Sequence, residues 1–139
     1  MNILFVCKHN LFRSKVAEAY FKKINKNKSI IATSAGIIKG DFLNKNQKKS
    51  LDLQKIISKK FGLEIRYKFI GLSMSLLKKQ DVIIIAAGDV PKILFDNKAY
   101  VKNVVQWKIK DYNLYGEKRV IDAISQIIAK VDNLAKGLK

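Results

Sequence analysis

The sequence has 139 residues, 48% of them hydrophobic, which suits one globular domain over residues 1–139. No apolar run reaches the roughly 18 residues that a membrane helix needs. Its one cysteine and one histidine cannot form an internal disulfide or a structural zinc site, so we expect a cytoplasmic protein without metal or cofactor. The net charge of +17 favours anionic substrates, but it is carried by scattered lysines with only three arginines, which argues against a dedicated nucleic-acid binder.

Strand-like and helix-like segments alternate along the chain. Four short apolar runs predict buried strands: residues 3–6, 30–34, 81–87 and 101–105. Three longer segments have the apolar period of amphipathic helices: residues 14–26, 47–61 and 117–134. Ser14 is expected to cap the first of these helices and Gly62 to end the second, with Leu53, Ile56 and Ile57 on its inner face. Shorter helices are expected after Ser73 and at Pro91.

This alternation predicts an α/β fold, a three-layer α/β/α sandwich with a parallel sheet of about four strands and helices on both faces. Right-handed crossovers place the loops that follow the strands along one edge of such a sheet, where these folds bind ligands. The loops in question are residues 7–14, 35–39, 88–91 and 107–115.

The loop between the first strand and the first helix combines a cysteine with an arginine. Cys7 ends the strand, where loop N–H groups and the helix N-terminus can stabilise its thiolate, the nucleophilic form. Arg13 can turn back to hold two oxygens of a phosphoryl group, and Ser14 can donate its hydroxyl to the Cys7 sulfur. Asn10 tolerates the left-handed conformation of a tight anion cradle. The pattern predicts a phosphate-handling cysteine enzyme.

The segment VCKHNLFRS resembles the C-x5-R-S loop of the low molecular weight protein tyrosine phosphatase family, which also contains thiol-dependent arsenate reductases. The resemblance continues through KVAEAYF, TSAG, DVIII and WKIKDY in the family's order, over nearly the whole chain. It implies a fold like that of phosphotyrosine protein phosphatase I.

The resemblance also implies a metal-free reaction in two steps. Cys7 attacks phosphorus, Arg13 binds the phosphate, and Asp111 is general acid and then general base. Ser34 would support the loop, and Tyr67 stands where a histidine often braces the loop asparagine. The remaining loop residues would surround the phosphate: Lys8, His9, Asn10, Leu11, Phe12 and Ser14.

Departures from the family pattern concern mainly the acid and the redox cysteines. Tyr112 replaces the proline that usually follows the acid, and Asp41 and Asp89 are rival acids, of which Asp89 fits a helix cap better. Ala87 occupies one of the positions where the reductases carry further cysteines, so Cys7 has no sulfur partner and arsenate reduction would need an external thiol. We therefore favour phosphatase chemistry and keep that reductase as the alternative.

Two further classes of protein share parts of this pattern. Phosphocysteine carriers of sugar phosphotransferase systems lack the arginine that this chain has at position 13. A basic binding module without catalytic activity would bind nucleic acid in a salt-dependent way and would not need Cys7. The expected substrate is a phosphorylated protein or a small phosphate monoester, with no membrane or nucleic-acid partner, and we expect a monomer. Apolar side chains expected around the cleft suit the aryl group of phosphotyrosine: Leu11, Phe12, Ile37, Ile38, Tyr112 and Tyr115.

Overall fold

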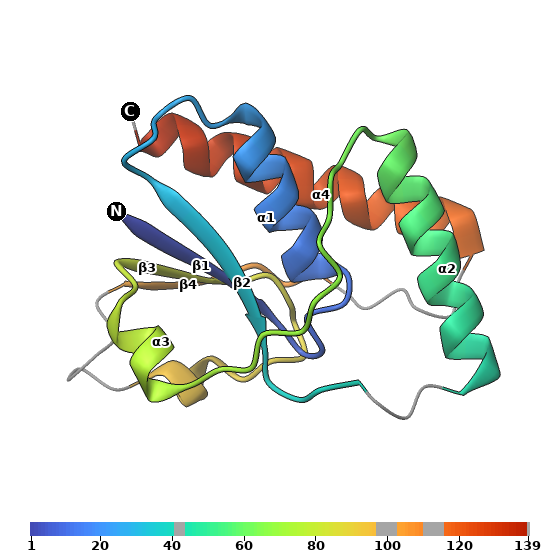
Figure 1. Ribbon diagram of the computed structural model, residues 1–139, viewed down its shortest axis with the longest axis horizontal. Coiled ribbons are helices and arrows are strands. Elements are labelled where there is room, and N and C mark those ends of the chain that lie inside the picture. The colour runs from blue at the N-terminus through green and yellow to red at the C-terminus, as the bar shows by residue number, and fades with distance from the viewer. Residues whose placement is uncertain (41–43, 97–102, 110–115, 139) are drawn as a thin grey trace.

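The computed structural model describes residues 1–40, 44–96, 103–109 and 116–138 (Figure 1). In chain order its elements are β1 (Asn2–Cys7), α1 (Arg13–Ile24), β2 (Ile31–Gly36), α2 (Lys45–Lys60), α3 (Met74–Lys78), β3 (Val82–Ile85), the 3-10 helix η1 (Lys92–Phe95), β4 (Val104–Gln106) and α4 (Gly116–Gly137). The expected alternation of strands and helices is therefore confirmed.

The four strands form one parallel sheet in the order β2-β1-β3-β4. Because successive side chains of a strand point to opposite faces, β1 supplies both layers of core. Ile3 and Phe5 pack in the cluster that includes residues of α1 and α4, whereas Leu4 and Val6 pack with residues of α3 and η1. Figure 1 shows α1 and α4 on one side of the sheet and α3 on the other. The α/β/α sandwich is confirmed.

Aromatic side chains fill the larger of these two cores. The ring of Phe5 lies 6.1 Å from that of Phe21 in α1 and 6.0 Å from that of Trp107, between ring centroids. Both pairs are tilted, an arrangement that aromatic rings favour. The contacts join β1, α1 and the segment after β4, and so hold two of the loops of the sheet edge in place.

The ends of two helices follow from local side chains. Asn44 caps α2 by accepting a hydrogen bond from the Gln47 N–H, and the Gln47 side chain accepts one from the Asn44 N–H. Beyond its other end, Gly62 adopts φ of 74°, as the predicted stop requires. Ser73 caps α3, also as predicted.

Two sequence expectations about the helices are wrong. Ser14 does not cap α1: the cap residue is Phe12, without a side-chain hydrogen bond, and Ser14 lies inside the helix with its hydroxyl engaged elsewhere. Ile56 was expected on the inner face of α2, but it is 56% exposed because the helix turns it toward solvent. No helix in the described parts of the chain is long and apolar enough to cross a membrane.

Candidate active site

The loop after β1 lies at the edge of the sheet where β1 and β2 end side by side. Cys7 pairs in register with Gly36, the last residue of β2, and is only 2% exposed. The Lys8 carbonyl accepts hydrogen bonds from the N–H groups of Ile37 and Ile38, at 2.8 and 3.0 Å. These two bonds tie the start of the catalytic loop to the chain that leaves β2.

A close backbone approach explains the glycine at the end of β2. A Cβ on Gly36 would lie 2.8 Å from the Asn10 Cβ and 2.9 Å from the Asn10 nitrogen, closer than real Cβ atoms come. Asn10 itself has φ of 54°, the left-handed conformation that the sequence predicted for it. The loop therefore folds back tightly over β2.

Asn10 is the centre of a buried hydrogen-bond network under this loop. Its Oδ1 accepts from the N–H of Ile70 at 3.1 Å, which leaves its Nδ2 to donate to Ser14 Oγ at 2.8 Å and to Ser34 Oγ at 3.0 Å. Ser34 then donates its own hydrogen to Glu18 Oε1 at 2.5 Å. The network supports the pairing of Asn10 with Ser34 that the sequence predicted.

The hydroxyl of Ser14 is held beside the thiol. Ser14 Oγ lies 2.9 Å from Cys7 Sγ and accepts a hydrogen from Asn10 Nδ2. A hydroxyl has one hydrogen and two lone pairs, so Ser14 can accept a second hydrogen from the Cys7 thiol or donate its own to a Cys7 thiolate. When Cys7 reacts as the thiolate, Ser14 is therefore placed to donate to its sulfur.

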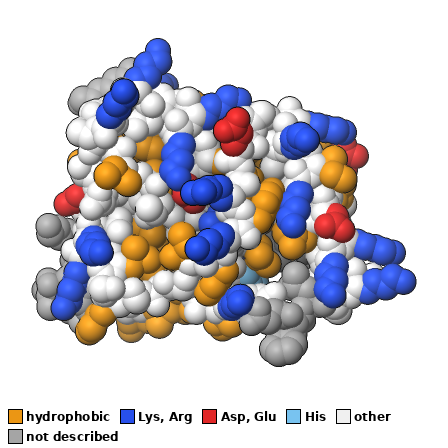
Figure 2. Space-filling view, viewed as in Figure 1, with side chains coloured by type: hydrophobic (Ala, Val, Ile, Leu, Met, Phe, Trp, Pro, Cys, Tyr) orange, Lys and Arg blue, Asp and Glu red, His pale blue; other side chains and the backbone are white. Residues whose placement is uncertain are grey.

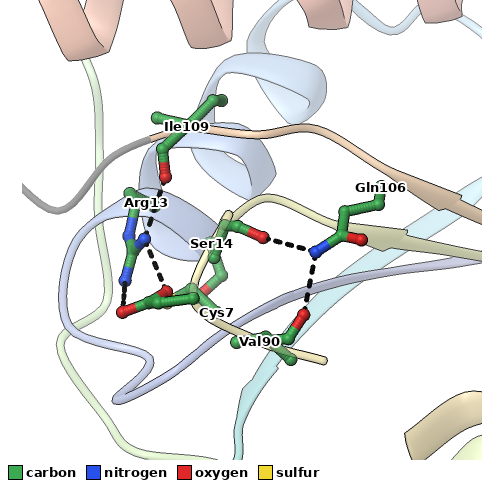
Figure 3. A network of polar contacts seen from close by, with 8 residues as sticks. Cys7, Arg13, Ser14, Val90, Gln106 and Ile109 are labelled. Carbon is green, nitrogen blue, oxygen red and sulfur yellow. Dashed lines mark hydrogen bonds and ion pairs between the residues drawn. The ribbon is translucent and has the colours of Figure 1, made fainter. Parts of the chain in front are cut away.

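Arg13 closes the loop from its other end and is only 4% exposed (Figure 3). Its Nη1 donates to Asp89 Oδ1 at 2.9 Å and to the Ile109 carbonyl at 3.0 Å, and its Nη2 donates to Asp89 Oδ2 at 3.3 Å. These bonds use three of the five N–H groups of a guanidinium. The Nε–H and the second hydrogen of Nη2 lie on one edge, which has the spacing to hold two oxygens of a tetrahedral anion.

The position of Asp89 corrects the sequence reading of this residue. It was expected to cap the helix at Pro91, but η1 has Pro91 as its cap residue and no side-chain capping bond. Asp89 instead pairs with Arg13, from which it is separated by 76 residues. Sequence reasoning missed this partner because only the parallel pairing of β1 with β3 brings the two loops together.

Asp111, the expected general acid, lies outside the described residues, as do Asp41, Tyr112 and Tyr115. The described segment that precedes Asp111 stops at Ile109, which is 1% exposed. The Ile109 carbonyl accepts hydrogen bonds from both Arg13 Nη1 and the Gly88 N–H. The chain that leads to Asp111 is thus anchored directly beside the arginine of the loop.

The other predicted loop residues have different surroundings. His9 Nδ1 lies 2.9 Å from the Ile38 carbonyl, to which it can only donate. Lys8 is exposed and Leu11 is half-buried. Phe12 was expected in the cleft wall, but its side chain is 6% exposed and belongs to the core beneath α1 and α4.

Tyr67 does not occupy the place expected for a brace of Asn10. The Asn10 Oδ1 receives the Ile70 N–H instead, whereas the Tyr67 ring is 40% exposed and lies 4.7 Å from the Lys55 ammonium of α2. Glu18, which sequence reasoning did not single out, ends the network by accepting from Ser34. The periodicity of α1 places Glu18 one turn after Ser14, but that signal does not distinguish it from an ordinary surface glutamate.

The arrangement contains two parts of an oxyanion cradle: a sulfur within hydrogen-bond distance of a hydroxyl, and a buried arginine at the other end of the same loop. No group of three or more His, Cys, Asp or Glu side chains that could hold a metal occurs among the described residues. A cradle of this kind handles phosphate or a similar tetrahedral anion by covalent catalysis.

The family profile described as low molecular weight phosphotyrosine protein phosphatase matches residues 2–139, and the chain belongs to this family. The family comprises cysteine-dependent phosphatases and reductases. A search of curated protein sequences finds no match.

Solved structures with this fold carry different activities. A protein tyrosine phosphatase from Entamoeba histolytica is 24% identical, with 99% of this chain and 96% of that one covered and a TM-score of 0.79. An arginine phosphatase from Drosophila is 20% identical, with coverage of 100% and 98% and a TM-score of 0.78. An arsenate reductase from Archaeoglobus fulgidus is 22% identical, with coverage of 96% and 98% and a TM-score of 0.70. At these identities the likeness establishes the fold and leaves the substrate open.

Proposed function

We propose that this protein is a phosphatase that hydrolyses phosphate monoesters, with protein phosphotyrosine as the substrate class, through a phosphocysteine at Cys7. The observation that carries the proposal is the 2.9 Å contact between Ser14 Oγ and Cys7 Sγ, in a loop whose other end holds the buried Arg13. It supports a sulfur nucleophile with a hydroxyl beside it that can donate to the thiolate, next to an arginine positioned by Asp89. A thiolate held against a phosphate-binding edge is what in-line attack on phosphorus needs.

In the first step the Cys7 sulfur forms a bond to phosphorus while the bond from phosphorus to the leaving oxygen breaks. Asp111 gives its proton to that oxygen. In the second step Asp111, now a carboxylate, takes a proton from water, the water oxygen bonds to phosphorus, and the sulfur leaves as thiolate. Arg13 and the loop amides hold the remaining phosphate oxygens throughout.

The surroundings of the loop favour an aryl leaving group. Leu11 and Ile37 are half-buried and Ile38 is 55% exposed, so they provide an apolar wall for a phenyl ring. The leaving group of phosphoarginine is a guanidinium, which is best held by carboxylates. The exposed Lys8 at the mouth of the loop disfavours such a cation.

Arsenate reduction is the alternative, and the number of cysteines weighs against it. Because Cys7 is the single cysteine of the chain, no intramolecular disulfide can regenerate it after arsenate is reduced. Reduction would therefore depend on an external thiol that attacks the Cys7 adduct. Hydrolysis of a phosphocysteine needs only water and Asp111.

The test is hydrolysis of aryl phosphates by the wild type, Cys7→Ser, Asp111→Asn and the exposed α2 variant Asp52→Asn as a matched control. We expect Cys7→Ser to abolish turnover and Asp52→Asn to leave it unchanged. Asp111→Asn should slow esters of poor leaving groups by about 100-fold or more, and good ones much less, because only a poor leaving oxygen needs the proton. Substantial turnover by Cys7→Ser would refute the mechanism.

A comparison of substrates then tests the substrate class. A phosphotyrosine peptide should be hydrolysed faster than the same peptide with phosphoarginine. Arsenate should be reduced at most slowly when glutathione and glutaredoxin are supplied. Preference for the phosphoarginine peptide, or thiol-dependent arsenate turnover that exceeds phosphatase activity, would contradict the assignment and leave the roles of Cys7 and Arg13 intact.

A further inference from the structure

A cavity lies beside α1, on the flank that faces the segment after α2. Its volume is about 690 Å³, within the range typical of small-molecule sites. Residues of α1 line one side, and Gly62, Glu64, Ile65 and Arg66 line the other. Figure 1 shows this segment passing alongside α1, and Figure 2 shows basic side chains gathered over the same region, with an acidic side chain among them.

The charged lining of this cavity is unbalanced. Four cationic side chains (Lys15, Lys22, Lys23 and Arg66) meet only two carboxylates, those of Glu18 and Glu64. The Glu18 carboxylate is already engaged, because its Oε2 accepts from Lys22 at 2.6 Å and its Oε1 from Ser34 at 2.5 Å. An excess of positive charge therefore faces the cavity.

Lys15 makes this imbalance more than a surface effect. The residue as a whole is only 3% exposed, but its Nζ is not among the buried side-chain atoms without a hydrogen-bond partner, so the ammonium is accessible from the cavity. Burial lowers the pKa of Lys15, and the neighbouring Glu18 opposes this shift. A partly desolvated ammonium gains more from an anion in the cavity than a fully exposed lysine does.

The walls indicate the size and type of such a ligand. Ala19 and Ile65 add apolar surface between the cationic groups. Arg66 lies on the opposite wall from Lys15 and Lys22, so a ligand must present anionic groups in two directions to reach both walls. Neither wall includes a residue of the catalytic loop, so the cavity is a separate site from the cradle around Cys7.

We propose that this cavity binds a small molecule with two or more phosphoryl or carboxylate groups, held between Lys15 and Lys22 of α1 and Arg66 of the facing segment. One anionic group contacts the Lys15 ammonium, and another contacts Arg66. The inference does not depend on the proposed phosphatase activity, because it concerns other residues. Glu18 is shared with the hydrogen-bond network of Asn10, so the two sites adjoin.

Inorganic pyrophosphate serves as the probe, titrated into the 15N-labelled protein and followed by NMR. The amides of Ala19 and Ile65 report on the cavity, and those of Asn10 and Leu11 report on the catalytic loop. The double variant Lys22→Gln/Arg66→Gln changes exposed cavity residues, and Lys26→Gln/Lys28→Gln removes the same charge from exposed positions outside the cavity. A urea midpoint for each variant verifies folding.

We expect the cavity amides to shift with a dissociation constant that rises about tenfold or more in Lys22→Gln/Arg66→Gln, equivalent to about 1.4 kcal/mol, and hardly changes in the control pair. Lys15→Met should weaken the same shifts. Shifts confined to the loop amides would overturn the proposal. Equal weakening of pyrophosphate binding by both double variants would also overturn it, because that result would indicate general charge attraction. Tighter binding of a polyglutamate peptide than of pyrophosphate would overturn it as well, because that result would indicate an acidic macromolecule as the ligand.

Discussion

The direction of the hydrogen bond to Cys7 can be tested by replacing Asn10 with aspartate. Asn10→Asp keeps the size, the tolerance for φ of 54° and the acceptor for Ile70, but it turns the Nδ2 donor into an acceptor. The Ser14 hydroxyl, now facing a carboxylate, should donate to it and cease to donate to Cys7. The sulfur then loses its only side-chain donor among the described residues.

The size of the effect follows from the bond that is lost. A hydrogen bond to a charged group contributes about 1.5–3 kcal/mol, so a donated bond from Ser14 predicts that alkylation of Cys7 slows by up to about 10- to 150-fold in the variant. Iodoacetamide reacts with the thiolate, and Cys7 is the single cysteine, so the alkylation rate reports on this one sulfur. Asn133→Asp on the exposed surface of α4 introduces the same chemical change away from the loop and serves as the control.

Alkylation of Asn10→Asp within about twofold of the wild type would refute a donated bond from Ser14 to Cys7, since a change of that size corresponds to only about 0.4 kcal/mol. Urea unfolding of Asn10→Asp is measured alongside its alkylation rate. Slowed alkylation in a variant that unfolds at the wild-type midpoint indicates loss of the hydrogen bond and not disruption of the loop. A fast rate in a folded variant would mean that Ser14 accepts from the thiol.

Three further predictions concern packing and charge. Gly36→Ala should lower the free energy of unfolding by about 1–3 kcal/mol in urea and slow aryl phosphate hydrolysis, because the new Cβ displaces the Asn10 backbone. Asp89→Ala should lower that free energy by about 1–2 kcal/mol, since it leaves the buried Arg13 without its carboxylate, and added phosphate should recover part of the loss. Lys15→Met should be more stable than the wild type at pH 7. The folded-state pKa of Lys15 is lowered, so the stability of the wild type rises with pH until about 10.5, the ordinary pKa of lysine. The urea midpoints of the wild type and Lys15→Met should therefore converge near that pH. A stability difference between Lys15→Met and the wild type that widens with pH would contradict the burial of Lys15. Unchanged stability of Gly36→Ala would contradict the close approach to Asn10, and unchanged stability of Asp89→Ala would contradict the ion pair with Arg13.

Much of the fold follows from local pattern. Short apolar runs such as residues 3–6 and 81–87 favour buried strands, and strands that alternate with amphipathic helices favour a parallel sheet. The strand expected over residues 81–87 is shorter in the structure, where β3 spans Val82–Ile85. Asn44 and Gly62 mark the ends of α2 through bonds and dihedrals within a few residues. Exposure was less predictable, as Ile56 shows, because it depends on which neighbours a helix meets.

The residues at the centre of the candidate site follow from local sequence. Cys7, Asn10, Arg13 and Ser14 lie within eight consecutive residues, so a strand, a tight loop and a helix bring them together by local geometry. The role of Asp111 rests on resemblance alone and stays a prediction, because the residue lies outside the described chain.

The hydrogen-bond and ion-pair partners of these groups depend on strand pairing, which local sequence does not show. Asp89 reaches Arg13 because β3 pairs with β1, and Ser34 reaches Asn10 because β2 pairs with β1 on the other side. Lys15 looked like one lysine among many until packing buried it. Contacts across strands depend on register and on the direction of each side chain, which residue types and spacing along the chain do not specify.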